Sequence, residues 1–267
     1  MKFFLVILFC LISIYGFSQE EIDQRNYGKI TIGESQYLLF DKVNLRSHPY
    51  TDSEIVKNLP IGSLMKIIGK SDSSLTLNGY SHNWYQVSQI DENNKEIGVQ
   101  GYLWGGFFAE NLYETENDPE VRFLYGLAKM KKTEWGEVPV VQVRAIISDK
   151  EIAQVSFEAI GSLTTYRNCE LLGNKGIRNI NEIIHFNFSD DFCGGAFGDV
   201  YIFWDKAILH HARTLHSGAD APVFSDESFI FPEDEGGKEG RIIFNESAGE
   251  DGDEGTVYDY QRTTDLI

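Results

Sequence analysis

The residues of this chain with the strongest potential for covalent chemistry are a cysteine and several histidines in the C-terminal half. Cys193 lies within residues 190–195, Asp-Asp-Phe-Cys-Gly-Gly. The histidines that could act as its base are His185, His210, His211 and His216. A catalytic cysteine is typically placed at the start of a helix, where the dipole stabilises the thiolate. The glycines after Cys193 disfavour a helix and the nearby aspartates disfavour a thiolate, so a structural thiol or a disulfide is the favoured interpretation.

Two further groups of residues are candidates for metal binding. His210 and His211 are adjacent, and neighbours on a strand point to opposite faces, so they cannot jointly ligate one ion from regular structure. Acidic, glycine-rich loops at residues 231–237 and 249–255 contain the oxygen ligands that Ca²⁺ prefers. Their spacing does not match an EF-hand loop, in which acids alternate and a glutamate closes the loop. We interpret both loops as solvated turns, and we predict no metal site and no cofactor.

The first 18 residues have the pattern of a secretory signal. Lys2 precedes the apolar run of residues 3–15, and Gly16 and Ser18 are small residues of the kind read by an exporting peptidase. The alternative is a retained anchor helix, but the run is shorter than the ~20 residues that a bilayer requires. We therefore expect cleavage between Ser18 and Gln19, an exported protein in the periplasm or outside the cell, and no membrane insertion after cleavage.

Cleavage would leave two cysteines, Cys169 and Cys193. An even pair of cysteines in an exported protein forms a disulfide more often than it remains as two free thiols. The sequence therefore predicts a Cys169–Cys193 bridge, which would stabilise the fold by ~3 kcal/mol in the loop-entropy model.

Charge excludes one class of partner. The formal net charge is −18, and removal of Lys2 with the signal leaves 22 basic against 41 acidic side chains. Such a surface repels nucleic-acid phosphates and anionic lipid headgroups, so no nucleic-acid partner is expected. The hydrophobic content of 42% is sufficient for packed cores.

Three short pieces identify residues 36–112. They are Val43-Asn44-Leu45-Arg46-Ser47, Trp84-Tyr85-Gln86-Val87 and Gly101-Tyr102-Leu103-Trp104. This arrangement resembles a bacterial SH3 (SH3b) domain, a small barrel used as a binding module in exported proteins. Gly-Tyr-Leu stands where the family usually has Gly-Trp-Val, and His48 replaces the small residue common after Arg-Ser. The resemblance implies an SH3-like barrel that binds a cell-wall peptide or an envelope protein without catalysis.

Aromatic residues of this barrel are the candidate ligand contacts, because flat rings offer a large contact area at low entropic cost. The set comprises Tyr50, Tyr80, Trp84, Tyr85, Tyr102, Trp104 and Phe107. Trp84 and Tyr85 are neighbours on a predicted strand and face opposite sides, so at most one is expected in the core. We assign Trp84 to the edge of the core and predict that Tyr50, Tyr85 and Tyr102 bind the ligand.

The rest of the chain has a pattern of short strands. Residues 19–35 form an N-terminal segment, residues 113–120 an acidic linker, and residues 121–267 a β-rich domain of unknown function. Residues 120–131 are the one plausible helix, with Asp118 as its cap and Pro119 in the first turn. We therefore predict a mainly β protein: an SH3-like small barrel followed by a β-sandwich-like or barrel-like domain.

These observations favour an exported, non-catalytic binding protein. One alternative is a cell-wall hydrolase of the cysteine-peptidase type with its chemistry in the C-terminal domain, since SH3b domains often accompany such enzymes. Another is an adhesion protein that binds carbohydrate or calcium.

Overall fold

The protein is a β structure over its described length. The computed structural model describes residues 29–134, 136–190, 195, 197–252 and 255–266. These residues form strands β1–β17 and one 3₁₀ turn, η1 (Gly105–Phe107). The predicted mainly β class is confirmed. Within these ranges, no helix has the length and apolar character needed to cross a bilayer.

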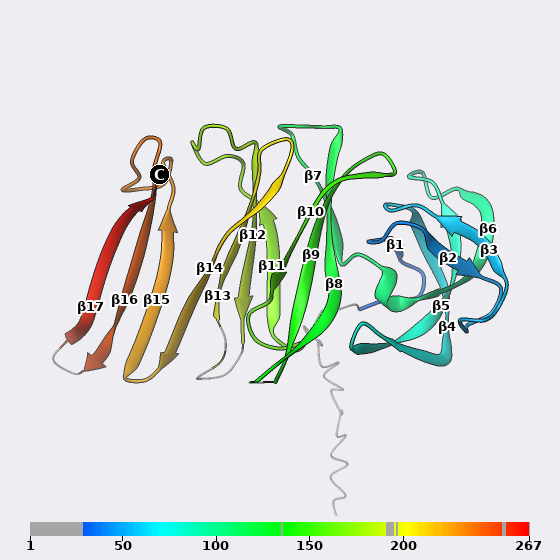
Figure 1. Cartoon of the computed structure of the whole chain (residues 1–267), viewed down its shortest axis with the longest axis horizontal. Helices are drawn as coiled ribbons and strands as arrows, with labels where there is room; N and C mark the ends of the chain where they lie inside the picture. Colours follow the sequence, from blue (N-terminus) through cyan, green and yellow to red (C-terminus); the bar gives the residue numbers. More distant parts are fainter. Residues whose placement is uncertain (1–28, 135, 191–194, 196, 253–254, 267) are drawn as a thin grey trace, which may run out of the picture.

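The first sheet curls around its own core at one end of the molecule (Figure 1). Its strands follow the order β1-β4-β5-β6-β2-β3. Their bounds are β1 (Ser35–Tyr37), β2 (Val43–Arg46), β3 (Ile55–Leu59), β4 (Leu64–Leu77), β5 (Tyr80–Ile90) and β6 (Glu96–Trp104). Along β2, Val43 and Leu45 are buried while Asn44 and Arg46 are half-buried, because successive side chains of a strand point to opposite faces. We call residues 29–110 the N-terminal unit.

Two turns of this unit form as their residues predict. Asn78 and Gly79 connect β4 to β5 with φ of 54° and 87°, the left-handed pair that a two-residue hairpin turn requires. In the turn after Pro60, Gly62 has φ of +74°, and a Cβ there would lie 2.7 Å from Cδ1 of Ile146. Gly62 is therefore required by the backbone and by its close approach to the next sheet.

The remaining strands form two further antiparallel sheets. The four-stranded sheet has the order β10-β9-β8-β7, and the seven-stranded sheet runs consecutively from β11 to β17. The bounds of the first are β7 (Asn111–Glu114), β8 (Val121–Thr133), β9 (Gly136–Ile147) and β10 (Lys150–Glu158). Those of the second are β11 (Tyr166–Leu171), β12 (Glu182–Ser189), β13 (Phe197–Trp204), β14 (Leu209–Asp220), β15 (Val223–Ile230), β16 (Ile242–Gly252) and β17 (Gly255–Leu266). We call residues 111–266 the C-terminal unit.

These two sheets share the largest core. It contains alternate residues of β8, such as Phe123, together with alternate residues of β12 and β13, such as Phe186 and Trp204. At one edge, the Tyr113 hydroxyl on β7 donates a 2.6 Å hydrogen bond to the carbonyl of Cys169 on β11. β10 contacts β14 at the opposite edge. The strands β15–β17 continue the large sheet beyond this shared core to the other end of the molecule (Figure 1).

The expected helix over residues 120–131 is wrong, because these residues form β8. Val121, Phe123 and Tyr125 recur with period two and face the shared core, and β8 pairs with β7 and β9 on its two sides. The predicted acidic linker is also structured in part: Glu114 belongs to β7, and the buried Thr115 donates a hydrogen bond to Glu182.

The two units are in direct contact. A small core cluster contains Leu39 and Ile61 from the N-terminal unit and Leu124 and Ile146 from β8 and β9. Backbone bonds also cross the boundary, for example from the amide of Met130 to the carbonyl of Asn78 at 2.8 Å. The first sheet is therefore packed against the second.

Candidate functional site

An apolar groove of about 320 Å³ opens on the N-terminal unit. We call it the aromatic groove, after Phe40, Trp84 and Phe107. Its other lining residues are Asp41, Lys42, Val43, Asn44, Arg46, Thr51, Leu75, Leu77 and Asn78. The groove thus combines rings and aliphatic side chains with a few polar groups, which is the composition of a typical small ligand site.

Packing from several elements holds the rings of the groove. The rings of Phe40 and Phe107 meet edge to face with centroids 6.3 Å apart, and the Phe107 ring meets Trp104 at 5.3 Å. The guanidinium of Arg144, on β9, lies 4.9 Å from the centre of the Phe40 ring. Trp104 in turn donates from Nε1 to the carbonyl of Leu75 at 2.8 Å. The groove is therefore preformed by contacts within and between the two units.

Hydrogen bonds hold the loop beside the groove, which connects β2 to β3. Arg46 donates to the carbonyl of Ser53 at 2.6 Å. The Ser53 hydroxyl bonds back to the carbonyls of His48 and Tyr50, each at 2.9 Å. Thr51 of this loop lines the groove. These bonds fix one wall before any ligand arrives.

The three tyrosines predicted from the sequence do not line this groove. Tyr50 is 49% exposed and stacks on His48, while its neighbour Thr51 reaches the groove. Tyr102 is half-buried on β6 opposite Gln86. The structure therefore does not gather these residues around one ligand position, although Tyr50 remains an exposed ring near the rim.

Tyr85 is placed wrongly by the sequence-based prediction. Trp84 and Tyr85 face opposite sides as expected, yet both are buried, with 3% and 4% exposure. Tyr85 belongs to the core of the N-terminal unit, where burial raises the pKa of its hydroxyl. Both sides of β5 are covered because β4 is long enough to bring Leu75 and Leu77 beside Trp84. Trp84 and Phe107 line the groove and belong to the aromatic set named in the sequence analysis, but they were not predicted to bind the ligand. Phe40 also lines the groove and was not in that set.

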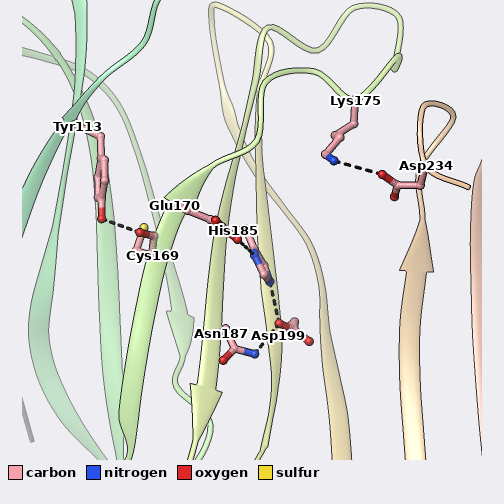
Figure 2. A network of polar contacts seen from close by, with 8 residues as sticks. All are labelled: Tyr113, Cys169, Glu170, Lys175, His185, Asn187, Asp199 and Asp234. Atoms are coloured by element: carbon pink, nitrogen blue, oxygen red, sulfur yellow. Dashed lines mark hydrogen bonds and ion pairs between the residues drawn. The ribbon is translucent and has the colours of Figure 1, made fainter. Parts of the chain in front are cut away.

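A second polar constellation lies on the seven-stranded sheet, on the face opposite the shared core. Figure 2 shows the His185 ring between the carboxylates of Glu170 and Asp199, which come from the neighbouring strands β11 and β13. Nδ1 lies 3.0 Å from Glu170 and Nε2 lies 2.7 Å from Asp199. Asn187 also donates to Asp199, at 3.0 Å, and the ring stacks on Tyr201 with centroids 4.6 Å apart.

Electrostatics determine what this cluster can do. Burial alone would lower the pKa of His185, but the hydrogen bonds and charges of Asp199 and Glu170 outweigh it, so the pKa lies above its ordinary value. Burial would raise the pKa of Asp199, but hydrogen bonds from His185 and Asn187 hold it below its ordinary value. Since carboxylates occupy both ring nitrogens, the histidine is a cross-strand clamp and is poorly placed to activate a nucleophile.

The predicted Cys169–Cys193 disulfide is not supported at Cys169, the one of the two cysteines that the structure describes. Cys169 is a free, buried thiol in the shared core, and burial raises the pKa of its sulfur. Cys193 lies outside the described residues, among which no disulfide is formed. Cys169 is in mid-strand on β11 and directed into the core, so a bridge would require the segment that contains Cys193 to enter that core.

Among the described residues, which leave out Asp253 and Glu254 of the second loop, the acidic loops and the remaining histidines do not converge. No group of three or more metal-ligating side chains is found in the described ranges. Asp234 of the first loop pairs with Lys175 at 3.1 Å, and Asp251 of the second accepts a hydrogen bond from Thr256. His210 bonds Asp205 and His211 bonds Thr214, so the adjacent histidines have separate partners.

Comparison with known proteins adds no relative to this picture. No protein-family model matches the chain, and neither the curated proteins nor the solved structures that were compared with it give a match.

Proposed function

We propose that this protein is an exported binding protein whose N-terminal unit holds an extended peptide in the aromatic groove. The observation that carries the proposal is the preformed groove itself, with Phe40, Trp84 and Phe107 on one apolar surface. Aromatic grooves of this kind suit extended or polyproline-type segments, which lose little conformational entropy on binding. The lining also includes polar side chains, among them Asn44, whose Oδ1 accepts from Asn58, and Arg46, which donates to the carbonyl of Ser53.

The resemblance of residues 36–112 to SH3b domains gives the proposal its chemical class. It points to a peptide of the cell wall, with an exposed segment of an envelope protein as the alternative source of the same extended backbone. The N-terminal unit is also the less acidic part of the chain: residues 29–110 contain seven basic and nine acidic side chains. A peptide ligand of either charge therefore meets little long-range repulsion there.

Export remains part of the proposal. Residues 1–18 lie outside the described part of the chain, and the support for a cleaved signal is their sequence pattern. N-terminal sequencing of the secreted or periplasmic protein should return Gln19 as the first residue. An intact Met1 terminus in the membrane fraction would contradict export by cleavage.

The binding proposal is tested with the mature chain and purified peptidoglycan sacculi. Leu77 is 39% exposed in the groove, so Leu77→Asp should reduce the retained fraction by at least about tenfold without a large change in thermal stability. Ile97, which is 49% exposed and outside the groove, supplies the matched control Ile97→Asp. Equal retention of both variants would show that the groove is not the binding surface.

The same incubation separates the hydrolase alternative. Soluble muropeptides released by the wild-type chain would favour an enzyme, whereas retention without release favours a binding module. The described residues offer little support for a thiol enzyme: Cys169 is buried with a raised pKa, and both ring nitrogens of His185 contact carboxylates.

A further inference from the structure

Two cationic side chains line the aromatic groove, and neither forms an ion pair within the described ranges. They are Lys42, which is exposed, and Arg46, which is half-buried. Arg46 donates to the carbonyl of Ser53, a neutral acceptor that leaves the guanidinium charge uncompensated. The lining includes one carboxylate, that of Asp41, which accepts a hydrogen bond from the amide of Ile61 at 3.4 Å. The groove thus has two basic side chains against one acid, on a chain whose formal net charge is −18.

Neutral donors belong to the same lining. Thr51 and Asn78 line the groove, and their side chains form no hydrogen bond with the part of the chain that the structure describes. A hydroxyl, a side-chain amide and an ammonium can each donate to a ligand, and such bonds are strongest when the acceptor is charged. The groups left without partners in this groove therefore favour an anionic ligand over a cationic one.

The backbone that carries Lys42 is fixed before any ligand binds. Lys42 has φ of 56°, in the left-handed region, and its carbonyl accepts from Nδ2 of Asn58 at 3.1 Å. The same nitrogen donates to Oδ1 of Asn44 at 2.9 Å. Asn58 on β3 thus holds two neighbouring parts of the groove wall together. The ammonium is attached to a rigid point beside the apolar surface.

We propose that the aromatic groove binds the free C-terminal end of a peptide, with the terminal carboxylate at Lys42 and an apolar last side chain against the rings. The inference rests on the proposed peptide-binding function and names the part of the peptide that the groove selects. The last side chain packs beside Trp84 and Leu77, and Thr51 and Asn78 are further donors for the carboxylate. A volume of about 320 Å³ is at the lower end for small-ligand sites, so it suits the end of a chain.

This selectivity implies the class of reaction that supplies the ligand. A new C-terminal carboxylate appears when water hydrolyses a peptide bond, and the other product is an amine. The groove therefore distinguishes a peptide that has been cut from one whose carboxyl end is still bonded. Recognition of this kind requires no catalytic group in the groove itself.

Three probe peptides test the proposal by titration calorimetry on the mature chain. They are acetyl-Pro-Pro-Ala-Leu with a free carboxylate, the C-terminal amide of the same peptide, and the C-terminal amide of acetyl-Pro-Pro-Glu-Leu. The prolines favour an extended backbone, and the third probe carries its negative charge on a side chain. We expect the acid to bind about fivefold more tightly than either amide, because a charge-assisted bond to an exposed ammonium is partly screened by solvent.

The possible outcomes separate this proposal from the proposed function. Equal affinities of the acid and its amide would overturn recognition of the terminus, and the groove would still be a peptide site if Leu77→Asp abolished both. A glutamate probe that binds as tightly as the acid would overturn the assignment to a chain end. No heat with any probe at millimolar concentration would also overturn it, whereas retention on sacculi that depends on Leu77 would still support the proposed function.

A pair of lysine variants locates the carboxylate. Lys42→Asn removes the ammonium and introduces a residue type that tolerates positive φ, so we expect it to lose the preference for the acid over the amide. Lys206→Asn is the matched control, because Lys206 is also exposed and has φ of 77°, on the turn between β13 and β14 and outside the groove. It should keep the full preference. A Lys42→Asn variant that also keeps it would refute the role of Lys42.

Discussion

The two units differ in how their surfaces are used. Residues 29–110 have almost balanced charge and enclose their core within one curled sheet that carries the aromatic groove. Residues 111–267 contain 14 basic against 29 acidic side chains, and their largest core is shared between two sheets. Beyond that core, Val257 and Tyr260 of β17 are exposed. The two units thus differ in charge and in how their cores are enclosed, and the proposed peptide groove lies on the unit whose charge is nearly balanced.

The two units also differ in how a buried tryptophan is held in the core of each. Trp104 and Trp204 are both fully buried, one in each unit. Trp104 donates from Nε1 to the carbonyls of Leu75 and His82, at 2.8 Å and 3.1 Å. The corresponding nitrogen of Trp204 is buried and donates to no acceptor among the described residues. Trp104 thus stabilises its unit both by packing and by hydrogen bonds to β4 and β5. Trp204 stabilises its unit by packing alone.

The largest expected effect comes from removing either ring. Trp104→Ala and Trp204→Ala should each cost ~3–5 kcal/mol of unfolding free energy, because each leaves a large cavity. Hydrogen exchange resolved by segment is the measurement. We expect Trp104→Ala to increase exchange mainly in β1–β6, and Trp204→Ala mainly in β8 and β11–β14. Equal increases throughout the chain in both variants would mean that the two units unfold as one, and the comparison between them would fail.

The next effect tests whether the segment between the units is structural. Glu182 is 3% exposed and accepts hydrogen bonds from the amide of Gly173 at 2.6 Å and from Thr115. Glu182→Ala should destabilise the C-terminal unit by ~1–3 kcal/mol, because buried donors lose their acceptor. Thermal unfolding measures this, with Glu158→Ala as an exposed control. A loss no larger than that of the control would mean that residues 113–120 are a free linker, as the sequence predicts.

Local signals were sufficient for much of the fold and insufficient for the site. The turns at Asn78-Gly79 and at Gly62 follow from residues that tolerate positive φ, and the alternation in β2 follows from side-chain polarity. Residues 120–131 have a helix-capping pattern, but their apolar residues have period two and face a core built from β11–β14. The strands that form that core are distant in sequence from residues 120–131, so local helix signals could not predict the effect of packing against them.

The groove was missed for a related reason. Phe40, Trp84 and Phe107 come from three separate segments, and the groove that they line also includes Leu75 and Leu77 because β4 continues from Leu64 to Leu77. The same long strand covers the side of β5 that carries Trp84, while Tyr85 faces the core on the other side. The sequence of β17 likewise has a weak strand pattern, because its apolar residues are few and exposed. Register and strand length, rather than residue type, decided these outcomes.

A smaller effect sharpens the contrast between the two tryptophans. Trp104→Phe removes a donor from two carbonyls, whereas Trp204→Phe removes a donor without an acceptor in the described structure. We expect Trp104→Phe to cost ~1–2 kcal/mol more than Trp204→Phe in urea unfolding. If Trp204→Phe lowers the unfolding free energy as much as Trp104→Phe does, Nε1 of Trp204 also has a hydrogen-bond acceptor. The two tryptophans would then not differ in how they stabilise their units.

The smallest effect is a pH dependence confined to the C-terminal unit. The pKa of His185 is raised above 6.5 in the folded state, so its contribution is fully present below pH 6.5 and is lost as pH rises through the folded pKa. The pKa of Asp199 is lowered below 3.8, so its contribution is present above pH 3.8 and is lost as pH falls through the folded pKa. Wild type should therefore exceed His185→Gln in stability most between pH 3.8 and 6.5.

We expect that difference to be about 1 kcal/mol, since Glu170 is half exposed and solvent screens its share. Thermal midpoints measured from pH 4 to pH 8 give the profile. His211, on β14 of the same sheet, supplies a control of opposite sign, because burial lowers the pKa of its ring and protonation then favours the unfolded chain. The advantage of wild type over His211→Gln should thus shrink as pH falls below 6.5. Parallel profiles for the two variants would show that neither histidine titrates as its surroundings require, and that His185 is no charged clamp between strands.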